Sequence, residues 1–126
     1  MGASDRRAFE GRRLGAASSE GDGTVNYYLK LDGYTQLGLQ WDVTNGGAGD
    51  YVITVAATMD PDPEAALSSK EFVDKTNDWF GAATFTADDF VEQSNIIAYA
   101  IRVRVVRNND GGNNDGAHTV WAKRIA

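Results

Sequence analysis

Apolar residues recur at every second position over long parts of this sequence. In the segment at 35–43, Leu37, Leu39 and Trp41 alternate with glutamine and glycine. The segment YVITVAATM at 51–59 repeats the same period. A period of two places successive side chains on opposite faces of an extended backbone, so each segment predicts a β-strand with one buried face.

Four further segments predict strands. They lie at 25–31, 71–76, 96–106 and 118–125, and the segment at 71–76 reads as a short edge strand. Short strands with turn-forming residues between them and almost no helix are typical of an antiparallel β-sandwich, here jelly-roll-like, and a β-barrel is the alternative.

The connections carry turn signals of their own. The glycine-rich turn at 44–50 holds an Asn-Gly pair, which favours a β-hairpin between the strands on either side of it. The polar loop at 107–117 predicts a second hairpin. Thr86 is expected to cap a single helical turn within 86–93.

The first 23 residues have no sustained apolar period and are rich in Gly, Ala, Ser and Arg. This composition predicts a flexible N-terminal arm at 1–23 and one folded domain at 24–126. The arm holds two arginine pairs, Arg6-Arg7 and Arg12-Arg13. We expect these pairs to meet carboxylates on a neighbouring subunit.

Composition removes several classes of function. The chain has no Cys and one His, which excludes disulfides, thiolate chemistry and multi-histidine metal sites. With a net charge of −6, the chain lacks the positive electrostatic field that attracts phosphate backbones. No nucleic-acid partner is therefore expected. No apolar run approaches the roughly 20 residues of a spanning helix, so no membrane partner is expected. We predict a protein that is not an enzyme and has no cofactor or metal.

Aromatic residues are the candidates for contact with a ligand. Trp79 and Phe80 stand together in a loop-like segment, and these two or Tyr34 are the residues expected to stack on a sugar. For Trp79, plugging one end of the sandwich is an equal alternative. Trp41 is in register with Leu39 and is assigned to the core.

Charged and polar residues on the last strands are candidates of another kind. Arg102 and Arg104 share one face of the strand at 96–106, and Ile97 and Ile101 are assigned to the opposite, core face. The arginines predict either a solvent face paired with carboxylates or a subunit-docking stripe. His118 is expected to be a polar strand-end residue rather than a catalytic one.

Several segments together resemble small virion proteins of tailed bacteriophages. The resemblance covers residues 25–126 and is carried by LDGYTQLGLQWDV, YVITVAATM, KTNDWFGAATFTADD, YAIRVRVV and HTVWAKRI. It implies a β-sandwich that serves as a head decoration, head fibre or tail-associated protein and attaches through its N-terminal arm. It further implies other virion proteins as partners, a homo-oligomer with a trimer favoured, and localisation in the virion. YAIRVRVV is also similar to the closing strands of discoidin-like sandwiches that bind sugars or lipids.

The main functional prediction is therefore a non-enzymatic structural protein of a virion. The alternative is a carbohydrate-binding, lectin-like module. That alternative would include calcium if Asp110 or Asp115 held the ion, although Asn, Asp and Gly in this loop are also what a tight turn requires.

Overall fold

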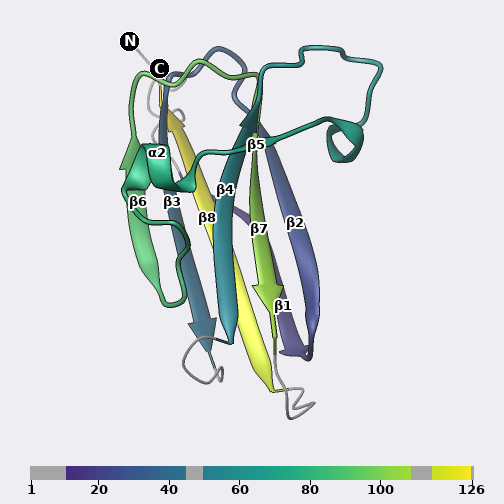
Figure 1. The fold of residues 1–126 in the computed structure, drawn as a ribbon, viewed down its shortest axis with the longest axis vertical. Coiled ribbons are helices and arrows are strands. Elements are labelled where there is room, and N and C mark those ends of the chain that lie inside the picture. Colours follow the sequence, from purple (N-terminus) through teal and green to yellow (C-terminus); the bar gives the residue numbers. More distant parts are fainter. Residues whose placement is uncertain (1–10, 45–49, 109–114, 126) are drawn as a thin grey trace.

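The computed structural model describes residues 11–44, 50–108 and 115–125. Two antiparallel four-stranded sheets pack face to face (Figure 1), which confirms the predicted β-sandwich. Sheet A has the strand order β1-β8-β3-β6, and sheet B has the order β2-β7-β4-β5. The strands are β1 Arg12–Glu20, β2 Gly23–Lys30, β3 Gln36–Thr44, β4 Tyr51–Thr58, β5 Val73–Asp74, β6 Asp89–Gln93, β7 Ala100–Arg107 and β8 Gly116–Ile125, and two short helical segments are η1 Leu67–Ser69 and α2 Thr76–Phe80.

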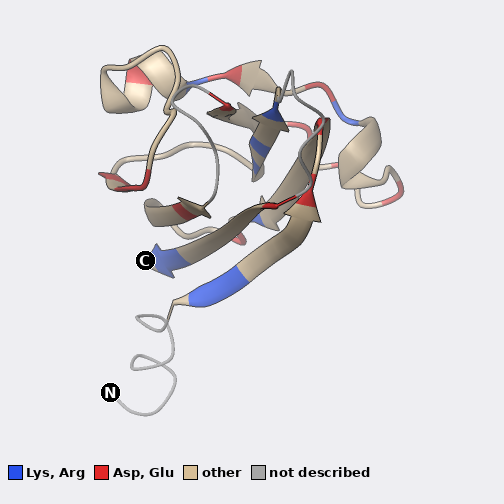
Figure 2. Ribbon diagram, turned by 90° about the horizontal axis from the view of Figure 1, so that it is seen from below, with Lys and Arg blue, Asp and Glu red and all other residues tan. Residues whose placement is uncertain are grey.

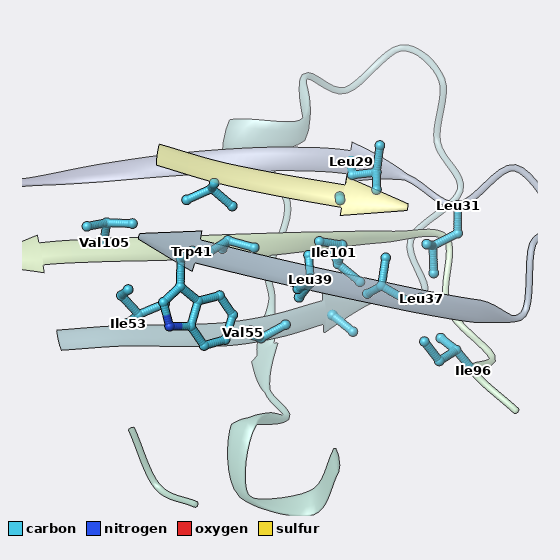
Figure 3. Close-up of a cluster of buried hydrophobic side chains, with 14 of the residues drawn as sticks. Leu29, Leu31, Leu37, Leu39, Trp41, Ile53, Val55, Ile96, Ile101 and Val105 are labelled. Atoms are coloured by element: carbon cyan, nitrogen blue, oxygen red, sulfur yellow. The ribbon is translucent and has the colours of Figure 1, made fainter. Parts of the chain in front are cut away.

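The core lies between the sheets and consists of the apolar faces that the sequence predicts. Leu37, Leu39 and Trp41 of β3 are at most 2% exposed. Ile53 and Val55 of β4 are fully buried on the facing sheet. Figure 3 shows these side chains meeting in one layer. Burial of each such side chain is worth about 1.5–3 kcal/mol relative to exposure, so this layer holds the two sheets together.

The connections between strands differ from the two predicted hairpins. β3 and β4 lie in different sheets, and so do β7 and β8. Strands that face each other across the core bury the same apolar residues as strands that lie side by side, so alternation does not separate the two arrangements. β8 instead pairs with β1 and β3, inside sheet A. The Asn-Gly pair falls at 45–49, outside the described residues.

The predicted flexible arm at 1–23 extends too far into the chain. Strand β1 lies within it and pairs with β8 at the edge of sheet A. Most side chains of β1 are small, and its Leu14 packs against the core. The strand forms through backbone pairing with β8, so it needs no apolar period that the sequence would display. Arg12 and Arg13 begin this strand, whereas Arg6 and Arg7 lie outside the described residues.

The predicted helical turn is also misplaced. The helix α2 begins at Thr76, whose buried hydroxyl accepts a hydrogen bond from the amide of Val55 and donates one to its carbonyl. These bonds fix α2 to β4. Thr86 instead precedes strand β6, which pairs with β3. Within the described ranges, neither helical segment has the length and apolar character to cross a membrane.

Two strand predictions concern sheet B. The short edge strand expected at 71–76 is confirmed as β5, at the edge of sheet B. The strand expected from residue 96 begins only at Ala100, and Ile97 is 82% exposed, so its assignment to the core face is wrong. From Ile101 onward the predicted core face of this strand is buried.

Candidate functional site

A row of large side chains crosses all four strands of sheet A. Arg13 of β1 pairs with Trp121 of β8. Trp121 pairs with Gln40 of β3, and Gln40 pairs with Phe90 of β6. Residues directly opposite each other in antiparallel strands share a face. Because Leu39 points into the core, its neighbour Gln40 and the whole outer row (Arg13, Trp121, Gln40, Phe90) lie on the outer face of the sheet.

A glycine makes this face concave. Gly38 lies on the same face as Gln40, between Lys123 on β8 and Glu92 on β6. A Cβ at Gly38 would lie 3.9 Å from Cζ of Phe90, so the phenyl ring stands beside the space that the glycine leaves open. Hollows of about 370 Å³ and about 110 Å³ meet here. We name this surface the sheet A groove, and its outward-facing residues are Gln36, Gly38, Gln40, Phe90, Glu92, Trp121 and Lys123.

Charge is distributed unevenly along the groove. Arg13 and Lys123 lie on its β1/β8 side, whereas Glu92 lies on its β6 side. Figure 2 shows the basic start of β1 beside the basic end of β8. Arg124 at this end is already held by Asp32, with 2.9 Å between Nη1 and Oδ2. The β1/β8 side is therefore basic in a chain whose net charge is −6.

Part of the outer face of sheet B is covered by the chain itself. Phe72 places its ring 5.6 Å from the ring of Tyr28 and 5.3 Å from the guanidinium carbon of Arg102. Ala56 lies on this outward face but is only 2% exposed. Burial, and then the neighbouring charge of Arg104, lowers the pKa of Arg102. This part of sheet B is thus closed by the segment that connects β4 and β5.

The predicted docking stripe lies on this covered face. Arg102 and Arg104 share the outward side of β7, as the alternation predicts. The Nε of Arg104 donates a hydrogen bond to Asn26 on β2, at 3.0 Å, while Arg102 contacts Phe72. A role of the two arginines in subunit docking stays a prediction.

The three aromatic residues predicted to contact a ligand lie elsewhere. Trp79 and Phe80 belong to α2, and both pack against the core. Phe80 lies 6.1 Å from the ring of Phe85, and Trp79 also lines an apolar hollow of about 410 Å³. Tyr34 stacks against the guanidinium of Arg124 at 5.0 Å. Trp79 is therefore the one of the three that both plugs the sandwich and borders an open space.

His118 belongs to a buried polar cluster and is only 2% exposed. Its Nδ1 lies 2.8 Å from the carboxylate of Glu20, and its Nε2 lies 2.7 Å from the hydroxyl of Tyr27. Because a carboxylate only accepts, Nδ1 donates to Glu20, and in the neutral imidazole Nε2 then accepts from the hydroxyl of Tyr27. The Tyr51 hydroxyl also donates to Glu20, and burial followed by this hydrogen bond raises the pKa of Tyr51. These hydrogen bonds link β1, β2, β4 and β8 through side chains.

The calcium alternative concerns Asp110 and Asp115, in the loop before β8. Within the described ranges, no group of three or more His, Cys, Asp or Glu side chains could hold a metal ion. Asp115 lies 4.0 Å from the guanidinium of Arg107. Asp110 lies outside the described residues.

Sequence reasoning did not pair Trp121 with Phe90. The alternation in β8 indicates that Trp121 faces outward, because its neighbours Val120 and Ala122 are buried. No local pattern shows that β6 lies two strands away from β8, since that neighbourhood depends on the pairing of both with β3.

No protein-family model and no curated protein sequence matches this chain. Solved structures do resemble it. Chitosan-binding module 1 of a chitosanase/glucanase from Paenibacillus sp. IK-5 aligns with a TM-score of 0.51 and 14% identity, over 96% of this chain and 86% of that chain. A periplasmic inhibitor of g-type lysozyme from Aeromonas hydrophila aligns with a TM-score of 0.46 and 13% identity, over 92% and 87%. The likeness to the chitosan-binding module shows a shared β-sandwich fold.

Proposed function

We propose that this chain is a carbohydrate-binding β-sandwich module whose ligand lies in the sheet A groove. The observation that carries the proposal is the outer row, in which Trp121 and Phe90 present aromatic side chains on one face. Flat aromatic rings offer apolar area to the faces of sugar rings at little conformational cost. Neighbouring strands lie about 4.8 Å apart, so the two side chains, separated by β3, are spaced by about 10 Å.

The rest of the groove suits a polar ligand with many hydroxyl groups. Gln40 stands between the two aromatic residues, and Gln36 stands at the end of the groove. An amide side chain both donates and accepts, which matches the hydroxyl groups of a sugar. The hollow above Gly38 leaves room for a ring between these groups. The shared fold with a module that is named for binding chitosan supports the same class of function.

The test is a glycan array followed by titration calorimetry with each glycan that binds. Trp121→Ala and Phe90→Ala are expected to abolish or strongly weaken binding, and both variants should keep the melting temperature of the parent within a few degrees. Tyr28→Ala, on the outer face of sheet B, is the matched control and should bind like the parent.

Two results would contradict the proposal. A silent array with folded protein would remove the carbohydrate class. Glycan binding that Trp79→Ala abolishes, while Trp121→Ala leaves it intact, would move the site to the apolar hollow beside α2.

The virion role stays a second prediction, as do the homo-oligomer and the absence of enzymatic activity. Docking through the N-terminal segment needs revision in any case, because Arg12 and Arg13 begin an edge strand of the folded domain. Particle binding by a chain that lacks residues 1–10, compared with the full chain, tests the part of the segment that precedes β1.

A further inference from the structure

Two basic side chains lie beside Trp121 on the open face of sheet A. Arg13 is its direct partner on β1, and Lys123 follows it by two residues on the same face of β8. Arg13 and Lys123 are therefore diagonal neighbours across the β1–β8 pair, and residues in this relation lie about 7–8 Å apart. The aromatic ring and both cationic groups therefore border the same part of the sheet A groove.

Basic side chains elsewhere in the chain form ion pairs with carboxylates. The chain has 18 acidic and 12 basic residues, so a carboxylate partner is easily found. Lys70 lies 3.4 Å from Asp60, and Arg124 lies 2.9 Å from Asp32. Arg13 is exposed and forms no ion pair within the described ranges. Its guanidinium is available to a ligand.

The opposite side of the groove has the opposite charge. Glu92 lies on β6, across Gly38 from Lys123. An anionic group would be attracted at the β1/β8 side and repelled at the β6 side. The two sides of the groove thus interact oppositely with a charged group of a ligand.

We propose that the ligand is an anionic glycan, and this proposal rests on the proposed function. A sugar ring stacks on Trp121, and its carboxylate or sulfate ester lies against the guanidinium of Arg13, on the basic β1/β8 side of the groove. The guanidinium of Arg13 offers paired donors that fit either group, and Lys123 adds a second positive charge. The uncharged part of the chain continues over Gln40 toward Phe90.

The experiment is calorimetry with four oligosaccharides of equal length. They are an oligogalacturonate, its carboxyl-reduced form, a sulfated galactan oligosaccharide and its desulfated form. We expect one or both anionic forms to bind, with Kd roughly tenfold or more below that of the neutral counterpart. Binding should weaken as NaCl is raised, because exposed charges are screened. The pair that responds distinguishes a carboxylate from a sulfate ester.

The variants separate a local effect from the net charge of the protein. Arg13→Gln should remove most of the preference for the anionic form, and Arg13→Lys should restore part of it. Arg104→Gln makes the same change of charge on the outer face of sheet B and should have no effect.

Neutral and charged forms that bind equally, in a way that depends on Trp121, would overturn this inference and leave the proposed function standing. An anionic preference that Arg104→Gln reduces as much as Arg13→Gln would also overturn it. Loss of all binding to every glycan would overturn both.

Discussion

The outer faces of the two sheets differ in how far the rest of the chain covers them. On sheet B, Phe72 lies over Tyr28 and Arg102, and the outward Ala56 is 2% exposed. On sheet A, Phe90 is 59% exposed on an outward strand position. Both faces belong to four-stranded sheets of one sandwich. The difference shows that connecting segments, not the sheets, decide which face stays exposed.

The covering segment of sheet B is held by its own contacts. Lys70 is buried, and its Nζ donates to the carbonyl of Asp62 at 2.7 Å and lies 5.2 Å from the centre of the Tyr99 ring. Thr58, at the end of β4, accepts a hydrogen bond from the amide of Asp60. The segment is therefore part of the folded structure and covers the part of the face around Tyr28 and Arg102.

The largest expected effect is on the open face. Trp121→Ala should weaken glycan binding roughly thirtyfold or more, because a central aromatic residue of a binding surface carries much of the affinity. Its cost in the free energy of unfolding should stay below about 1 kcal/mol, because the side chain lies outside the core. Calorimetry and urea denaturation measure the two quantities. A large loss of stability with unchanged binding would reverse the contrast between the faces.

On the covered face, the expected effect is on stability. Phe72→Ala should lower the free energy of unfolding by about 1–2 kcal/mol, which is less than a fully buried phenylalanine would cost. The loss comes from contacts with Tyr28 and Arg102. Urea denaturation measures the loss, and glycan affinity serves as the internal control that should not change. Stability equal to that of the parent would mean that the segment does not hold this face.

A smaller effect is expected where the open face is hollow. Gly38→Val should weaken glycan binding by roughly three- to tenfold by filling the groove. Stability should be unchanged or slightly higher, since the new Cβ meets nothing closer than 3.9 Å and glycine is unfavourable within a strand. If binding improved, the hollow would not be where the sugar lies. Gly116→Val is the contrasting variant and should destabilise the fold, because its side chain would overlap the guanidinium of Arg107.

The smallest effect concerns pH and the covering segment. The amide of Asp62 donates to the Asp60 carboxylate, and this hydrogen bond, more than the charge of Lys70, lowers the pKa of Asp60 from its ordinary 3.8. A lowered pKa in the folded state contributes stability that is present above the unfolded value and lost as pH falls through the folded one. Asp60→Asn should therefore lose slightly less stability than the parent between neutral pH and pH 3, measured by thermal melts. Identical acid profiles would contradict this contribution.

Much of the fold was predictable because strand faces are local. The alternation around Trp41 identifies a core strand. The alternation of β7 places Arg102 and Arg104 on the face of the strand that points away from Ile101 and the core. Strand β1 was not predictable in this way. Its small side chains carry no apolar period, and its pairing with β8 joins the two ends of the described chain.

The candidate site, too, was predictable from the sequence only in part. The outward direction of Trp121 follows from the buried neighbours Val120 and Ala122 on its own strand. Its position relative to Phe90 and Arg13 depends on β3 and β1, which come from distant parts of the sequence. Trp79, the aromatic residue that the sequence favoured, lies in α2 against the core because the buried Thr76 hydroxyl holds that helix on β4.

The sequence by itself determined that this chain is built of antiparallel strands, with a sandwich favoured over a barrel, and which side of most strands faces the core. Those properties depend on the order of neighbouring residues, which the period of two records directly. Only the tertiary structure decided which strands lie side by side, that one outer face is covered, and that Trp121, Gln40 and Phe90 form a single row. Long-range pairing makes these decisions, since exchanging strands between the sheets keeps every apolar face buried and changes only the neighbours on the outside.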